Sequence, residues 1–130
     1  GRNLKLSNSS LRRWAMYIRT RGGEVVARFL EHAAKNASGD VIEFTWEDIV
    51  KWAALDDVMA YNVSRALTAL QHCRVIRWNG RKYVVNNASY VRDLAERGEL
   101  ADYVAFIMFN YMAGVCSRLN ALIEELEDDE

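Results

Sequence analysis

Residues 75–85 read V-I-R-W-N-G-R-K-Y-V-V, two short runs rich in β-branched and aromatic residues on either side of Asn79-Gly80. Asparagine and glycine tolerate the positive φ angles of a type I′ turn, so this stretch predicts a β-hairpin with a two-residue loop. That loop sets four cross-strand pairs: Trp78 with Arg81, Arg77 with Lys82, Ile76 with Tyr83, and Val75 with Val84. Two cations, Arg77 and Lys82, would then face each other, and a bound phosphate would relieve their repulsion. Cations on an exposed hairpin also protect edge strands from aggregation, which is the structural alternative.

The forty residues before the hairpin predict a short strand and two helices. Residues 41–44 are β-branched or aromatic and predict the strand, and Thr45 can cap a helix that ends near Leu55. We expect Asp56-Asp57 to cap a second helix, over residues 58–72. At about 100° per residue its inward face comprises Met59, Val63, Ala66, Leu67 and Leu70. Its solvent-facing stripe comprises Tyr61, Ser64, Arg65, Thr68, Gln71 and His72.

The order helix, strand, helix, turn, helix, hairpin resembles the winged helix-turn-helix superfamily of transcription regulators. The likeness is carried by Val63-Ser64-Arg65-Ala66-Leu67, Leu70, Val75-Ile76-Arg77 and Gly80-Arg81-Lys82-Tyr83-Val84-Val85, roughly a third of the chain. It implies a mainly α fold with a small hairpin, a recognition helix at 58–72 and a wing at 74–85. Members of the superfamily usually have glycine before the first wing strand, whereas this chain has Cys73-Arg74.

The resemblance implies binding to double-stranded DNA. The recognition helix would enter the major groove with Tyr61, Ser64, Arg65, Thr68 and His72, and Arg65 can pair with guanine. The wing would hold phosphates with Arg74, Arg77, Arg81 and Lys82. The structural alternative is an ordinary polar helix face.

Further helices are expected on both sides of residues 23–86, the predicted winged-helix domain. A helix from Ser9 or Ser10 to about Thr20 forms an N-terminal extension within residues 1–22, and Gly22-Gly23 should separate it from a helix starting at Glu24. Residues 87–123 predict a helix over 90–97 and a long helix from Glu99 to about Leu126, whose apolar stripe favours a homodimer. Residues 124–130 form an acidic tail.

Composition indicates one folded domain, since the chain has 130 residues, 51% hydrophobic and 27% charged. The net charge of −1 hides an asymmetry: six of the 18 acidic residues lie in 124–130, which leaves residues 1–123 with 17 minus 12, or +5. No metal, cofactor or catalytic motif is present, so we expect no enzyme. The two cysteines, Cys73 and Cys116, are expected as separate reduced thiols, and the absence of a long apolar run predicts a cytoplasmic protein without membrane contact.

The leading hypothesis is therefore a dimeric DNA-binding transcriptional regulator. The alternative is a winged-helix interaction module that binds protein within a replication or transcription assembly, and RNA or single-strand binding is a third possibility.

Overall fold

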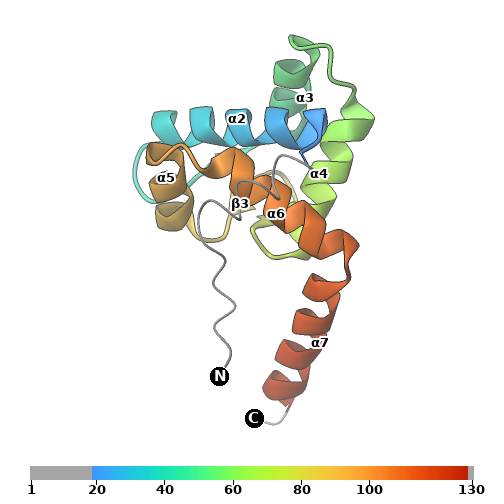
Figure 1. The fold of residues 1–130 in the computed structure, drawn as a ribbon. Coiled ribbons are helices and arrows are strands. Elements are labelled where there is room, and N and C mark those ends of the chain that lie inside the picture. The colour runs from blue at the N-terminus through green and yellow to red at the C-terminus, as the bar shows by residue number, and fades with distance from the viewer. Residues whose placement is uncertain (1–18, 129–130) are drawn as a thin grey trace.

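The computed structural model describes residues 19–128 as a mainly helical protein with a small antiparallel sheet. Its elements in chain order are α2 (Arg21–Asn36), β1 (Glu43–Phe44), α3 (Trp46–Ala54), α4 (Ala60–His72), β2 (Ile76–Trp78), β3 (Tyr83–Val85), α5 (Ala88–Glu96), α6 (Leu100–Met112) and α7 (Val115–Asp128). In Figure 1, α2 lies across α5 and α6, α3 and α4 stand at one end, and α7 projects away from the other helices. The helix predicted from Ser9 or Ser10 falls almost entirely outside the described residues.

Helix α2 begins earlier than expected, and its two glycines lie within its first turn. The Thr20 hydroxyl caps the helix by accepting a hydrogen bond from the Gly23 N–H at 2.9 Å. The predicted helix start at Glu24 is therefore wrong, because Gly22 and Gly23 lie inside the helix and do not interrupt it. A Cβ added to Gly22 would lie 2.5 Å from the carbonyl oxygen of Asn62 in α4, so glycine permits this close contact.

The hydrophobic core forms where α2 meets the other helices and the sheet. Val63, Ala66, Leu67 and Leu70 of α4 are buried as predicted, but Met59 is 70% exposed and precedes the helix. The largest side chains with almost no exposure are Val25, Val26, Leu30, Ile42, Ile49, Val63, Leu67, Leu70, Ile76 and Val104. Their distribution ties the region of the hairpin and α4 to the C-terminal α6 in one core.

The sheet has the strand order β1-β3-β2, and the hairpin register differs from the predicted one. The observed pairs are Ile76 with Val85, Arg77 with Val84, and Trp78 with Tyr83. The turn is centred one residue later, on Gly80-Arg81, because the Asn79 N–H donates to the Lys82 carbonyl at 3.0 Å. The Asn79 side-chain oxygen also accepts from the N–H groups of Arg81 and Lys82, at 2.9 and 2.8 Å. This asparagine turn requires a positive φ at Gly80 alone, and the predicted type I′ register is therefore wrong.

A non-glycine residue with positive φ follows each of the helices α3 and α4. Asp57 has φ 57° and Arg74 has φ 61°. After α4, the N–H of Val75 donates to Leu70 and that of Arg74 to Gln71, the pattern of a Schellman motif. Asp57 completes the same motif after α3, so the prediction that Asp56-Asp57 caps the start of α4 is wrong. The cap position of α4 is Met59, which has no side-chain capping bond.

The predicted long C-terminal helix is broken at Gly114, which has φ 76°. Its two parts, α6 and α7, are bent by 75°, because the left-handed backbone at Gly114 ends the first helix. Among residues 19–128 no single helix is long and apolar enough to cross a membrane, and only this bent pair together reaches that length. The break brings the first turn of α7 against the end of α4.

A disulfide joins Cys73 to Cys116 across that contact, with the two Cα atoms 5.2 Å apart. The prediction of two separate reduced thiols is wrong. The cysteines are 43 positions apart in the sequence, and only the path of α6 and α7 places them together.

Candidate nucleic-acid interface

Helix α4 presents a polar stripe to solvent on the side opposite its buried residues. The predicted residues Tyr61, Ser64, Arg65, Thr68 and His72 are all exposed. The Arg65 guanidinium lies over the Tyr61 ring, 5.9 Å from its centroid, which is a cation–π contact on the exposed face of the helix. The first three turns of α4 thus display an arginine, hydroxyl groups and an aromatic ring.

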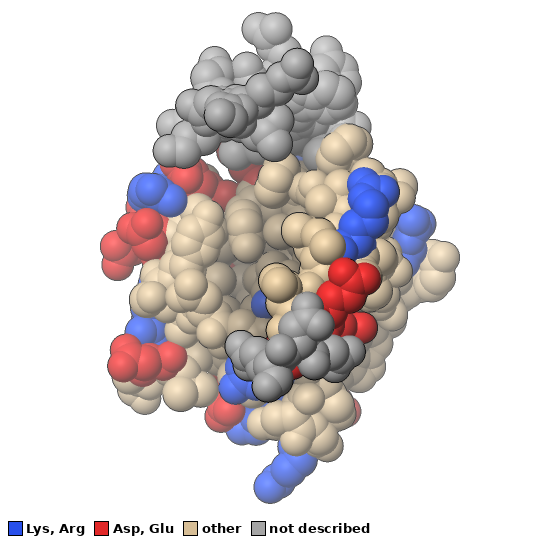
Figure 2. Space-filling view, turned by 90° about the horizontal axis from the view of Figure 1, so that it is seen from below, with Lys and Arg blue, Asp and Glu red and all other residues tan. Residues whose placement is uncertain are grey.

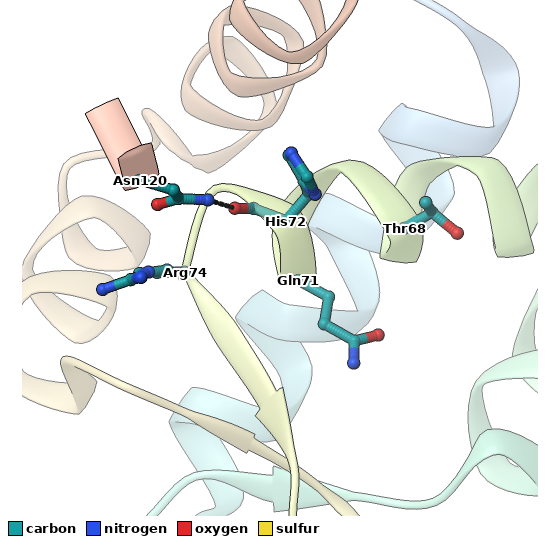
Figure 3. A pocket seen from close by; sticks show the side chains of 5 residues that line it. All are labelled: Thr68, Gln71, His72, Arg74 and Asn120. Atoms are coloured by element: carbon teal, nitrogen blue, oxygen red, sulfur yellow. Dashed lines mark hydrogen bonds between the residues drawn. The ribbon is translucent and has the colours of Figure 1, made fainter. Parts of the chain in front are cut away.

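His72, at the C-terminal end of the stripe, is held by α7. Its Nε2 lies 2.8 Å from the Ser117 hydroxyl, and its ring packs edge-on against Tyr111 with centroids 5.2 Å apart. Asn120 donates a side-chain N–H to the His72 carbonyl at 2.9 Å (Figure 3). The structure therefore assigns His72 to the contact between α4 and α7, whereas the sequence placed it in the groove-reading set.

A polar hollow of about 320 Å³ lies beside this contact. It is lined by three of the predicted site residues, Thr68, His72 and Arg74, together with Gln71 and Asn120 (Figure 3). Gln71 was visible on the solvent stripe in the sequence, but nothing in the sequence places Asn120 here, because it lies on the separate helix α7. All five side chains carry hydrogen-bonding groups.

The hairpin cations Arg77 and Lys82 do not face each other. Arg77 stands opposite Val84 and donates from Nη1 to the Asn86 side-chain oxygen at 2.6 Å. The Lys82 ammonium lies 3.3 Å from the Glu43 carboxylate of β1. The predicted repulsion between Arg77 and Lys82 is wrong, because the shifted turn removes their pairing. Both side chains have partners within the protein.

Two other cations near the hairpin have neither an ion pair nor a side-chain hydrogen bond among residues 19–128. They are Arg74, between α4 and β2, and Arg81, in the turn. The Arg74 backbone is fixed by Asn86, whose side chain donates to the Arg74 carbonyl at 2.7 Å, so Asn86 connects Arg74 with Arg77. Arg74 and Arg81 are therefore the hairpin residues best placed to hold a phosphate.

Trp78 is a candidate that the sequence did not single out. It is 46% exposed and packs edge-on against Tyr83, which in turn stacks on Phe44. An exposed indole supported by a row of rings can stack on a sugar or a base. Its position beside the predicted turn could have identified Trp78 as a candidate, but the predicted register treated it only as the cross-strand partner of Arg81.

The acidic turn before α4 is partly neutralised by α2. Arg28 pairs with the Asp56 carboxylate at 3.0 Å, and Arg21 donates to the Asp56 carbonyl at 2.7 Å. The charge that Asp56 presents to an approaching phosphate is thus reduced by its own arginine partner.

In the view from below (Figure 2), cations and anions are interspersed, and uncharged side chains cover most of that face.

The described residues contain no group of three or more His, Cys, Asp or Glu side chains arranged to hold a metal. Tyr103 in α6 lies away from α4 and the hairpin, and burial, aided by the neighbouring Tyr90, raises its pKa. The arrangement on α4 and the hairpin offers hydrogen bonds, cations and aromatic faces, which are means of binding.

Comparisons with protein-family models, curated proteins and solved structures find no match for this chain. The chain's own geometry therefore carries the functional inference.

Proposed function

We propose that this protein binds double-stranded DNA as a winged-helix transcriptional regulator, with α4 in the major groove and the β2–β3 hairpin as the wing. The observation that carries the proposal is the exposed stripe of α4, formed by Tyr61, Ser64, Arg65 and Thr68, which the other residues of 19–128 leave uncovered. A helix whose apolar face is buried on its own domain and whose polar face is free has the form that groove reading requires. The element order from α2 to β3 gives further support.

Individual roles follow from side-chain chemistry. Arg65 offers the planar pair of donors that matches guanine, and Thr68 offers a hydroxyl to a base or a phosphate. Arg74 at the base of the hairpin and Arg81 in its turn hold the DNA backbone. Arg77 and Lys82 contribute to the local positive potential, although Asn86 and Glu43 engage them first.

A homodimer through the C-terminal helix completes the proposal. Leu119, Leu122 and Leu126 of α7 are 53%, 55% and 68% exposed, an apolar surface that a second copy would cover. Two-fold symmetry would then match a palindromic DNA site.

The DNA-binding test compares wild type with Arg74→Ala/Arg81→Ala on a labelled duplex at several salt concentrations. Each lost phosphate contact lowers the slope of log affinity against log salt by about 0.9, so the double variant should lose nearly 2. Lys51→Ala is the matched control, because Lys51 is an exposed cation of α3 outside the interface. An identical slope in wild type and the double variant would contradict the assigned phosphate contacts.

Sequence reading is tested by selecting bound duplexes from a random pool. Arg65→Ala should lower discrimination at one position by about 1–3 kcal/mol while leaving the salt slope nearly unchanged. The same measurement on single-stranded DNA and on RNA tests the third possibility, since tighter binding to a single strand would remove groove reading as the function.

A second candidate function is an interaction module that binds protein, and the turn between α3 and α4 favours it. Leu55 and Met59 of this turn are 83% and 70% exposed, and Tyr61 in the first turn of α4 is 66% exposed. A cluster of exposed apolar side chains is typical of a protein-binding surface. Absent or salt-insensitive duplex binding by wild type would favour this function over DNA binding.

A further inference from the structure

Helix α7 carries a heptad-like apolar stripe that leaves the body of the protein. Val115, Leu119, Leu122 and Leu126 follow one another at intervals of four, three and four residues, the spacing of a coiled-coil seam. The stripe starts beside the buried Cys116, which is 7% exposed, and its three leucines are more than half exposed. A seam that begins in the core and continues into solvent is incomplete without another helix.

Two opposite charges border this seam on the same edge. Arg118 directly precedes Leu119, and Glu125 directly precedes Leu126, so the two residues are one heptad apart. Within residues 19–128, neither side chain takes part in an ion pair. They lie about two turns apart along one helix, too far to pair with each other.

We propose that α7 pairs in antiparallel orientation with α7 of a second copy, so that Arg118 of each copy faces Glu125 of the other. In this orientation equivalent edges of the two seams lie side by side, and the two-fold axis creates the Arg118–Glu125 contact twice. The proposal rests on the homodimer of the proposed function and assigns its geometry.

The distribution of charge along α7 favours this orientation over a parallel pair. Glu124, Glu125 and Glu127 lie in the last turns, and Arg118 lies in the first. A parallel pair would bring the two acidic ends together, where they repel each other. An antiparallel pair places each acidic end beside the partner's Arg118 and near the positive end of the partner helix dipole.

The pairing would also set the distance between the two copies of α4. The Cys73–Cys116 disulfide and the hydrogen bond from Asn120 to His72 tie α7 to the end of α4. Because α7 is anchored in this way, the seam positions the α4 helices as a rigid pair, which reading two half-sites requires.

The test is sedimentation equilibrium of the full chain at low salt, which gives the dimer dissociation constant. Arg118→Glu should raise this constant about tenfold, because two attractive contacts become repulsive. Arg118→Glu/Glu125→Arg should restore it to within about threefold of wild type, since the swapped charges again face each other. Lys51→Glu makes the same charge change on α3 and should leave the constant unchanged. Circular dichroism and thermal unfolding of each variant check that the fold is intact.

Each alternative outcome is decisive for the proposal. In a parallel pair Arg118 would have no Glu125 opposite it, so a wild-type dimer that Arg118→Glu leaves unweakened would overturn the antiparallel arrangement while keeping the homodimer. Weakening without recovery in the swapped variant would overturn the Arg118–Glu125 contact. A wild-type chain that stays monomeric at all concentrations would overturn both the homodimer and this geometry. Duplex binding is measured separately and would still test the DNA-binding proposal.

Discussion

Cys73, the C-cap residue of α4, is bonded to Cys116, the second residue of α7, and their Cα atoms lie 5.2 Å apart. The bond joins the helix that presents the candidate DNA-reading stripe to the helix that presents the candidate dimer seam. Ser117 and Asn120 add hydrogen bonds to His72 at the same place. The orientation of α7 is thus fixed from α4 as well as through Gly114.

Removing the disulfide should destabilise the protein. Closing a loop of this length restricts the unfolded chain, and Cys73→Ser/Cys116→Ser should lower the free energy of unfolding by about 2–4 kcal/mol. Urea unfolding followed by circular dichroism measures the change. A thiol reductant should bring wild type to the stability of the double variant and leave the variant itself unaffected. Equal stability of reduced and oxidised wild type would contradict the bond's contribution.

Arg74→Gly should stabilise the fold while weakening DNA binding. Arg74 holds φ 61°, a conformation that costs a side chain with a Cβ about 1–2 kcal/mol and glycine almost nothing. Glycine also makes the unfolded chain more flexible, which offsets part of this gain. We therefore expect the free energy of unfolding, measured by thermal unfolding, to rise by about 0.5–1 kcal/mol. Arg74→Ala keeps the Cβ and should show no such gain, yet both variants should lose about 0.9 from the salt slope of duplex binding. A glycine variant less stable than the alanine variant would contradict the strain.

Gly22→Ala should destabilise the contact between α2 and α4. The added Cβ would lie 2.5 Å from the Asn62 carbonyl oxygen, so the helices must move apart, at a cost of about 1–3 kcal/mol. Gly23→Ala is the control, because its nearest neighbour is the Met108 sulfur, at the flexible end of a side chain. Thermal unfolding should rank Gly22→Ala below Gly23→Ala, and the reverse order would contradict the proposed role of Gly22.

Tyr103 should make stability depend on alkaline pH. Burial, with a smaller contribution from Tyr90, raises its pKa in the folded state, so the unfolded chain loses this proton first, near the ordinary tyrosine value of about 10. Its stabilising contribution is complete below that pH and is lost as the pH rises through the higher folded-state pKa. Tyr103→Phe should therefore show a shallower fall in unfolding free energy above pH 10. The exposed Tyr61→Phe is the comparison, and equal slopes for Tyr103→Phe and wild type would contradict the expectation.

Much of the local structure could be predicted because it depends on neighbours in sequence. Thr45 caps α3 by accepting from the Asp48 N–H at 3.1 Å, and Asn87 caps α5 by accepting from the Tyr90 N–H at 3.2 Å. The two faces of α4 also follow from helical periodicity, and Val63, Ala66, Leu67 and Leu70 are buried as expected. These features need only the spacing of apolar residues and the local supply of hydrogen-bonding side chains.

Some predictions were wrong because the same residues support two competing local conformations. Asn79-Gly80 favours a type I′ turn, but the Asn79 side chain can also bond the two following N–H groups, and this shifts the turn by one residue. A shift of one at the turn changes every cross-strand partner, so the contact between Arg77 and Lys82 disappeared with it. Gly114 similarly permits two backbone conformations, helical and left-handed, and the left-handed one ends α6.

The sequence by itself determined the positions of α3, α4 and α5, the presence of a hairpin after α4 and the polar stripe of α4, because periodicity and turn chemistry act over a few residues. The tertiary structure decided the Cys73–Cys116 bond, the hydrogen bond between His72 and Ser117, and the place of Asn120 beside Arg74. These contacts join residues more than 40 positions apart. They depend on the direction in which α7 leaves Gly114, which is set by packing and backbone geometry that no local pattern encodes.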